Sequence, residues 1–142
     1  IQLFEAALDK DGIAYKEYAI ADTNEVQSVT TAAAGECDVL YIPTDNTLAS
    51  VTETVYNVVA PAKVPVIAGE EGICNGCGVA TLSISYYDLG YATGEMAYEI
   101  LAEGADITTM DVRYAPNVTK KYNAKICEEL GITVPDDYVA IQ

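Results

Sequence analysis

Histidine is absent from this chain of 142 residues. Without an imidazole, Ser-His-Asp and Cys-His catalytic centres are excluded, and the usual zinc sites lose one of their main ligands. The absence therefore removes most familiar hydrolytic mechanisms. We expect no catalytic residue, no metal and no cofactor in this chain.

Positive charge is scarce too, because seven Lys and Arg residues face 22 Asp and Glu residues, a formal net charge of −15. A surface that binds nucleic acid needs a basic patch to neutralise phosphates, so we expect no nucleic-acid partner. With 51% hydrophobic and only 20% charged residues, the composition is that of one folded globular domain.

Long apolar runs are also missing, and none approaches the ~20 residues that cross a bilayer. The sequence begins at Ile1, with no charged leader segment before it. We therefore expect a mature product or a piece of a longer protein.

Short apolar runs alternate with amphipathic stretches from end to end, and cap or turn residues stand at the junctions. The pattern predicts strands at residues 13–18, 38–43, 64–68, 79–84 and 111–114. It predicts helices at residues 1–10, 23–34, 88–103 and 119–130, and one more that begins at the turn 44–47. The run 38–43 is typical of a strand buried on both faces of a parallel sheet. The fold class is therefore α/β, a doubly wound parallel sheet with flanking helices.

In such a sheet, ligands bind beyond the carboxyl ends of the strands, which here selects the loops 44–47, 69–78 and 85–88. The first loop consists of Thr44, Asp45, Asn46 and Thr47. Asp45 can pair with an ammonium group, and the backbone N–H groups near Asn46 and Thr47 can receive a carboxylate. The alternative is that Asp45 or Asn46 simply caps the helix that follows.

Two other rim positions are candidates. Glu70 and Glu71 follow the strand 64–68, although adjacent acids in a glycine-flanked loop are commonly just solvated. Tyr86 and Tyr87 precede a helix and offer aromatic faces for a flat ligand, or else serve packing alone.

Cys74 and Cys77 form a CxxC motif, which serves redox chemistry or half of a zinc site. A zinc site would need a second pair of ligands, and a redox motif should open a helix, whereas the three glycines nearby argue against a helix. We therefore expect a local disulfide or two free thiols. The same loop lacks both phosphate-binding glycine motifs.

Four phrases then occur in a distinctive order: DVLYIPTDNT at 38–47, PVIAGEE at 65–71, YDLGYATG at 87–94 and NAKICEELGITVP at 123–135. Together they resemble the substrate-binding proteins of ABC transporters, in the branch that includes tryptophan and tyrosine uptake proteins. The resemblance implies a type I periplasmic-binding fold, in which two α/β lobes close on a ligand. Residues 1–142 would form the second lobe region, and the segment 85–110 would return to the first lobe.

The resemblance also implies the site and the partners. The cleft would be lined by Thr44, Asp45, Asn46, Thr47, Glu70 and Tyr86. The protein would be a non-catalytic, extracytoplasmic receptor of an ABC importer, with permease subunits as partners and a lipid anchor outside this chain. Its ligand would be a zwitterion, an aromatic or other hydrophobic amino acid.

Two features give rise to further expectations. The helical face formed by Leu89, Met96 and Ile100 would be exposed in an isolated second lobe, or covered by another copy of the chain. The Cys74–Cys77 segment is unusual for the family, and the alternative function that would use it is a flavodoxin-like thiol-disulfide enzyme, which requires a low thiol pKa. A third possibility is the effector-binding half of a transcriptional regulator with the same fold.

Overall fold

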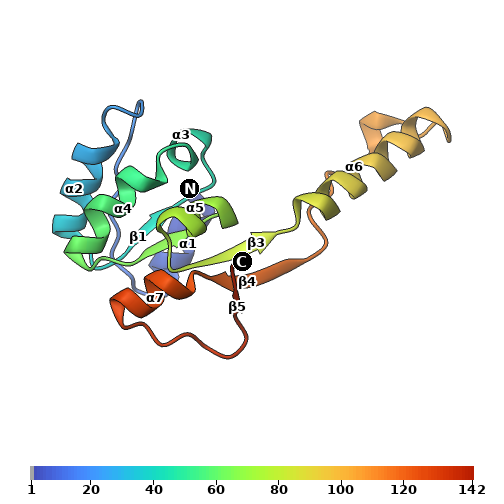
Figure 1. Cartoon of the computed structure of the whole chain (residues 1–142). Helices are drawn as coiled ribbons and strands as arrows, with labels where there is room; N and C mark the ends of the chain where they lie inside the picture. The colour runs from blue at the N-terminus through green and yellow to red at the C-terminus, as the bar shows by residue number, and fades with distance from the viewer. Residues whose placement is uncertain (1) are drawn as a thin grey trace.

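The computed structural model describes residues 2–142 and confirms the α/β class. The chain has five short strands. Figure 1 shows helices packed around the strands and one long helix that extends away from the body. The strands are β1 (Leu40–Ile42), β2 (Val66–Ala68), β3 (Ala80–Ile84), β4 (Val118–Tyr122) and β5 (Val139–Ala140). The α-helices are α1 (Gln2–Lys10), α2 (Val26–Glu36), α3 (Asn46–Ala49), α4 (Thr52–Ala62), α5 (Glu71–Cys77), α6 (Tyr86–Leu101) and α7 (Ala124–Leu130).

The strands form one sheet in the order β1-β2-β3-β4-β5. The first three are parallel, and their register places Ile42, Ala68 and Thr81 in one row across the sheet. Strand β4 then runs antiparallel to β3, and β5 runs parallel to β4. The sheet is therefore mixed, because the chain leaves along β3 into α6 and comes back along β4.

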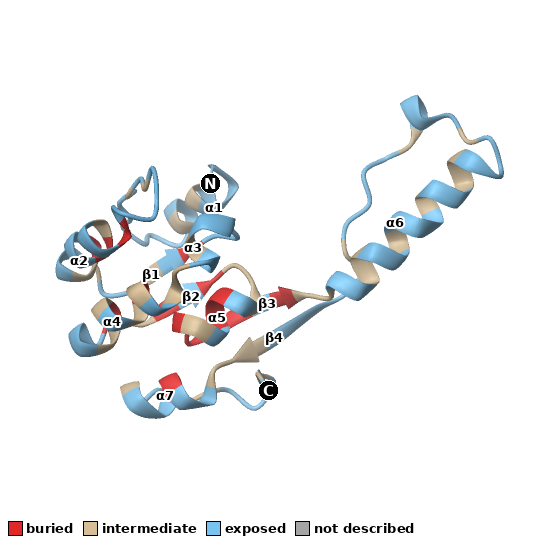
Figure 2. Cartoon of the chain, turned by 45° about the horizontal axis from the view of Figure 1, so that its top comes forward, coloured by how far each residue is buried: buried red, intermediate tan, exposed pale blue. Residues whose placement is uncertain are grey.

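The main core lies on one face of this sheet, under α2, α4 and α5. Val66, Ala68 and Ile73 are almost completely buried there with Val26 and Val55. In Figure 2 the buried residues are concentrated in the central strands and the helices that touch them. A smaller cluster around Val79, Ile126 and Cys127 packs α7 beside it.

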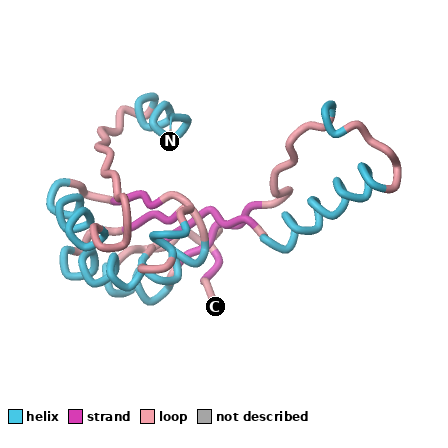
Figure 3. Tube along the Cα trace, turned by 90° about the horizontal axis from the view of Figure 1, so that it is seen from above, coloured by secondary structure: helices cyan, strands magenta, loops and turns pink. Residues whose placement is uncertain are grey.

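The opposite face of the sheet is covered only in part. Tyr41, Ile67 and Leu82 point to that face, and between 38% and 56% of each residue is exposed. Helix α1 lies on this side (Figure 3), where Phe4 stacks on Tyr41 with ring centroids 4.3 Å apart. The expectation that the strand in 38–43 is buried on both faces is therefore wrong, because one short helix is too small to cover the sheet.

Two predicted strands are absent. Residues 13–18 lie outside the sheet, and no described strand pairs with them. Side-chain contacts hold this segment instead, such as the hydrogen bond that Tyr18 donates to Glu36 at 2.8 Å. Residues 111–114 are irregular. The next strand, β4, instead begins at Val118, and it overlaps a segment in which the spacing of Tyr122, Ile126 and Leu130 predicted a helix from residue 119.

Several helix boundaries differ from the predicted ones because other residues cap them. Helix α7 begins after Asn123, which accepts a hydrogen bond from Ile126 N, and it ends at Gly131 as expected. Ser85, rather than Asp88, caps α6. Helix α2 runs on past the expected stop at Gly35, and the helix after the 44–47 turn is divided into α3 and α4.

The loop 69–78 contains the short helix α5, contrary to the expectation that its glycines would prevent one. These glycines serve close packing. A Cβ at Gly76 would lie 2.1 Å from Thr52 Oγ1 on α4, and one at Gly78 would lie 2.9 Å from Cys74 Cα. Because α5 needs this proximity to α4 and to its own preceding turn, glycine is required by tertiary contact rather than by chain reversal.

Helix α6 and the segment that returns from it extend away from the body, as Figures 1 and 3 show. No residue of α6 is buried. The predicted face of Leu89, Met96 and Ile100 is half-buried, so the expectation that it would be exposed is wrong. The return segment folds back on α6, and Arg113 pairs with Glu99 at 2.6 Å.

No helix among residues 2–142 is both long and apolar enough to span a membrane.

The assigned core predicts that the effect of a substitution on stability depends strongly on whether the replaced residue is buried. Replacing fully buried Ile73 by Ala should lower the free energy of unfolding by about 2–5 kcal/mol, because the substitution removes buried methyl groups and leaves a cavity. Replacing Ile107, which is 67% exposed, should change it by less than about 0.5 kcal/mol. Urea unfolding followed by circular dichroism measures both, and equal effects would contradict the assigned core.

Candidate functional site

The three loops selected from the sequence do lie at one edge of the sheet. Thr44 follows β1, Glu70 follows β2, and Ser85 with Tyr86 follows β3. The first two loops touch, because Thr44 Oγ1 donates to Gly69 O at 3.2 Å. A Cβ at Gly69 would lie 2.6 Å from Thr44 N, so only glycine permits this close approach.

Asp45 is the N-cap of α3, as the alternative interpretation predicted. Its Oδ1 accepts a hydrogen bond from Leu48 N at 2.9 Å. The other oxygen, Oδ2, makes no hydrogen bond or ion pair with any described residue, and the side chain is exposed. Capping therefore occupies only half of this carboxylate, and a second partner can still bind Oδ2.

Helix α3 has only four residues, from Asn46 to Ala49. Its first intrahelical bond is Ala49 N to Asp45 O, which leaves the N–H groups of Asn46 and Thr47 outside the helix ladder. Because so short a helix carries little macrodipole, any attraction for an anion at this turn depends on those two donors alone.

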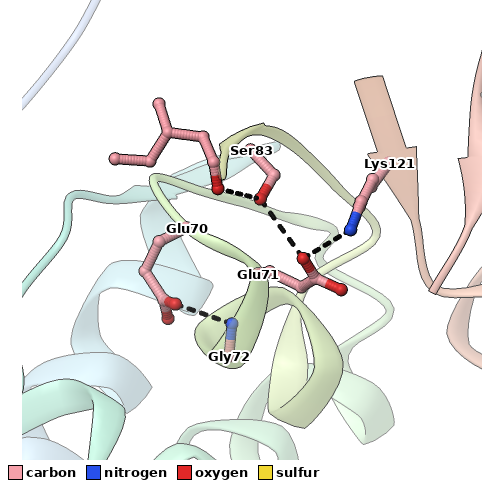
Figure 4. Close-up of polar contacts among 6 residues, drawn as sticks. Glu70, Glu71, Gly72, Ser83 and Lys121 are labelled. Atoms are coloured by element: carbon pink, nitrogen blue, oxygen red, sulfur yellow. Dashed lines mark hydrogen bonds and ion pairs between the residues drawn. The ribbon is translucent and has the colours of Figure 1, made fainter. Parts of the chain in front are cut away.

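Glu70 caps α5, and both of its carboxylate oxygens take part in hydrogen bonds. Its two carboxylate oxygens accept from Gly72 N, at 2.7 Å, and from Ile73 N. Figure 4 shows the Glu70 side chain turned toward the start of the helix. Glu70 therefore shapes the rim by starting α5, with both oxygens already in use.

Glu71, the next residue, joins three elements, as Figure 4 shows. Its Oε2 accepts from Lys121 Nζ on β4 at 2.6 Å and from Ser83 Oγ on β3 at 3.3 Å. The Glu71 and Lys121 side chains are only 38% and 28% exposed, which makes this the most buried ion pair among residues 2–142. Partial burial weakens solvent screening of the pair compared with a fully exposed one.

A cavity of about 270 Å³ lies beside this ion pair. It is lined by residues from α5, β3, β4 and the start of α6, namely Glu71, Ser83, Ile84, Ser85, Tyr86, Thr119 and Lys121. Tyr86 is thus the predicted site residue that lies in this cavity, while Glu70 lies next to it in sequence. Thr44, Asp45, Asn46 and Thr47 lie at the end of β1 and are not part of its lining.

Sequence reasoning missed Ser83 and Lys121, and it set Glu71 aside as a solvated rim acid. Lys121 was missed because the pattern predicts a helix for its segment, and on a helix Lys121 would not face Ser83. A strand assignment for 118–122 would have placed it opposite Thr81, on the same side of the sheet as Ser83. No local signal in the sequence points to the pairing with Glu71.

The cysteines of the CxxC motif are free thiols inside the core rather than a redox centre. Cys74 and Cys77 are 0% and 1% exposed, and burial raises the pKa of each thiol to about 12. Burial also raises the pKa of Cys127. The thiol-disulfide alternative needs the opposite shift, because the thiolate is the nucleophile. Nor do Cys, Asp and Glu residues in the described part of the chain gather into a group of three or more able to hold a metal.

Comparison with known proteins identifies similar sequences and structures. The family model described as ABC transporter substrate binding protein matches residues 1–141. A tyrosine-binding protein of Clostridioides difficile (strain R20291) is 39% identical over 100 residues, which are 67% of this chain and 29% of that protein.

Similar structures have also been solved. A substrate-binding protein with adhesive properties from Clostridium difficile, in its ligand-free open form, is 34% identical, with a TM-score of 0.74 over 99% of this chain and 49% of its own. An ABC domain from Streptococcus pneumoniae in complex with L-Trp is 32% identical, with a TM-score of 0.84 over 95% of this chain and 45% of its own. The chain therefore spans about half the length of these structures.

The state of the cysteines predicts a simple labelling pattern. At pH 8, a thiol with a pKa of about 12 is ionised in roughly one molecule in ten thousand, so Cys74 and Cys77 should resist DTNB in the folded chain. Half-buried Cys37 should react first, and all four cysteines should react in guanidinium chloride. Rapid labelling of Cys74 or Cys77 in the native state would restore the redox alternative.

Proposed function

This chain belongs to the family of ABC transporter substrate-binding proteins, and from that premise we propose that it binds an amino acid, aromatic or otherwise hydrophobic, at the carboxyl edge of its sheet. The observation that carries the proposal is the junction of two strand ends there, where Asp45 exposes an unpaired carboxylate oxygen. The likeness to a tyrosine-binding protein and to a structure in complex with L-Trp supports an aromatic ligand.

In this proposal Asp45 has two functions. Oδ1 starts α3, and Oδ2 accepts the ligand's ammonium group as a charge-assisted hydrogen bond. The N–H groups of Asn46 and Thr47 receive the ligand's carboxylate. Thr44 and Glu70 hold the two loops in place, since each already bonds to backbone. Tyr86 contributes an aromatic face farther along the edge.

We further propose that the complete protein has two lobes and that this chain supplies the second. The helix α6 and the segment to residue 110 would pack on the other lobe, which supports a cleft between them. A strongly exposed apolar surface on α6 favours this arrangement, since Tyr87 and Leu101 are 80% and 85% exposed. The receptor would be extracytoplasmic, would deliver its ligand to ABC permease subunits and would be held at the membrane by a lipid anchor outside this chain.

The two tasks of Asp45 can be separated by mutation. Asp45→Asn keeps a good N-cap but loses the charge, so it should leave thermal stability nearly unchanged and weaken amino-acid binding by about tenfold or more. Asp45→Ala should weaken binding similarly and also cost about 1 kcal/mol of stability. Isothermal titration calorimetry and thermal melting of the two-lobed protein measure these effects.

Thermal melting of the wild-type protein and of both variants is measured with the twenty amino acids and with simple nucleosides, because a bound ligand raises the melting temperature by mass action. The wild-type protein should respond selectively to aromatic or branched amino acids. A response to nucleosides alone would contradict the proposed ligand class, and full binding by Asp45→Asn would contradict the role of Asp45.

The lobe proposal predicts self-association of the isolated chain. With no first lobe to cover α6, two copies should associate through it, so analytical ultracentrifugation should show a concentration-dependent rise in mass. Tyr98→Glu with Leu101→Glu should abolish that rise, because charged residues would then stand on the shared face. If the unmodified chain stays monomeric at every concentration, the surface is not a docking face.

A further inference from the structure

The cavity beside Glu71 lies at a distance from the Asp45 turn that suits the far end of a long ligand. The register places β1, β2 and β3 side by side, so their carboxyl ends are separated by two strand spacings, about 10 Å in all. Asp45 follows β1, whereas Ser83 belongs to β3. A ligand whose ammonium group binds at Asp45 can therefore reach this cavity when its side chain runs along the edge.

The charges in the cavity suit a neutral polar group better than an ion. Glu71 and Lys121 are paired with each other at 2.6 Å, so each charge is already compensated by the other. Asp45 differs, since it forms no ion pair with any residue that the structure describes. A charged head group gains more at Asp45, and an uncharged hydroxyl fits beside the Glu71–Lys121 pair without leaving a buried charge unpaired.

The cavity also offers an acceptor oxygen and donor hydrogens that remain available. Glu71 uses Oε2 for both Lys121 and Ser83 (Figure 4), and its Oε1 makes no hydrogen bond with residues 2–142. The Lys121 ammonium has three donors, one of which is used by Glu71. A phenol hydroxyl donates one hydrogen bond and accepts others, so it matches this pair, and Tyr86 also lines the cavity.

We propose that this cavity receives the phenol hydroxyl of an aromatic amino acid, which donates to Glu71 Oε1 and accepts from Lys121 Nζ. Glu71 and Lys121 are then specificity-determining residues that favour a hydroxylated ring over a plain hydrocarbon ring. The inference rests on the proposed function, since it concerns the side-chain end of the same ligand. Sites that hydrogen-bond a ligand hydroxyl discriminate strongly against the analogue that lacks it.

Calorimetry on the two-lobed protein tests this with tyrosine and phenylalanine as probes. The wild type should bind tyrosine at least about tenfold more tightly than phenylalanine, the effect of a hydrogen bond to a charged group. Lys121→Met and Glu71→Ala should each weaken tyrosine binding by about tenfold and leave phenylalanine binding within about twofold, because only tyrosine uses these partners.

The matched control is Lys120→Met. Lys120 is the neighbouring residue on β4, half-exposed and paired with Asp137 at 2.5 Å, and it is not part of the cavity lining. This variant should leave both affinities and their ratio unchanged. A second test needs no variant: 4-fluorophenylalanine fills the space of the ring but cannot donate, so it should bind the wild type like phenylalanine rather than like tyrosine.

Three results would overturn the inference. The first is equal affinity of the wild type for tyrosine and phenylalanine. The second is an equal loss of both ligands in Lys121→Met, which would place the ligand's head group, not its side chain, in the cavity. The third is binding of 4-fluorophenylalanine as tight as that of tyrosine. Failure of the wild type to bind any amino acid would instead refute the proposed function, and the inference with it.

Discussion

The parallel alignment of β1, β2 and β3 is the constraint on which the rest of this structure depends. It places Ile42, Ala68 and Thr81 in one row and so gathers three loops at the same edge of the sheet. The core beneath the row is tightly closed, and the contact between the Thr44 and Gly69 backbones brings the first two loops together. Because the strands are only three to five residues long, a small shift in register would separate these loops.

Acidic and hydroxyl side chains at this edge serve mainly as helix caps. Asp45, Glu70 and Ser85 each accept backbone hydrogen bonds at the start of a helix. Capping fixes these side chains in position without a basic neighbour, which suits a chain with so few cations. The exception is Glu71, whose partner is one of the seven Lys and Arg residues in the chain. Rigid caps around one compensated charge pair are the kind of pre-organised polar surface that selects a small ligand.

The uneven covering of the sheet and of α6 supports the proposal that this chain is one of two lobes. One face of the sheet has a dense core, whereas Ile67 and Leu82 remain open to solvent on the other. The two strands β3 and β4 connect the body to α6, and the Glu71 side chain bonds to both of them. The same ion pair that lines the cavity therefore also steadies the connection to α6.

The sequence by itself determined the α/β class, three of the strands, the loops at the carboxyl edge and the family resemblance. These features depend on local apolar runs and on turn and cap residues, which a sequence pattern reports directly. Only the tertiary structure decided that 118–122 is a strand, that residues 13–18 are not, and that glycines 76 and 78 pack a helix rather than break one. The ion pair between Glu71 and Lys121 joins residues 50 positions apart, and it exists because β4 pairs with β3. Local periodicity carries no information about such a pairing, since long-range partners are chosen by burial and register in the folded chain.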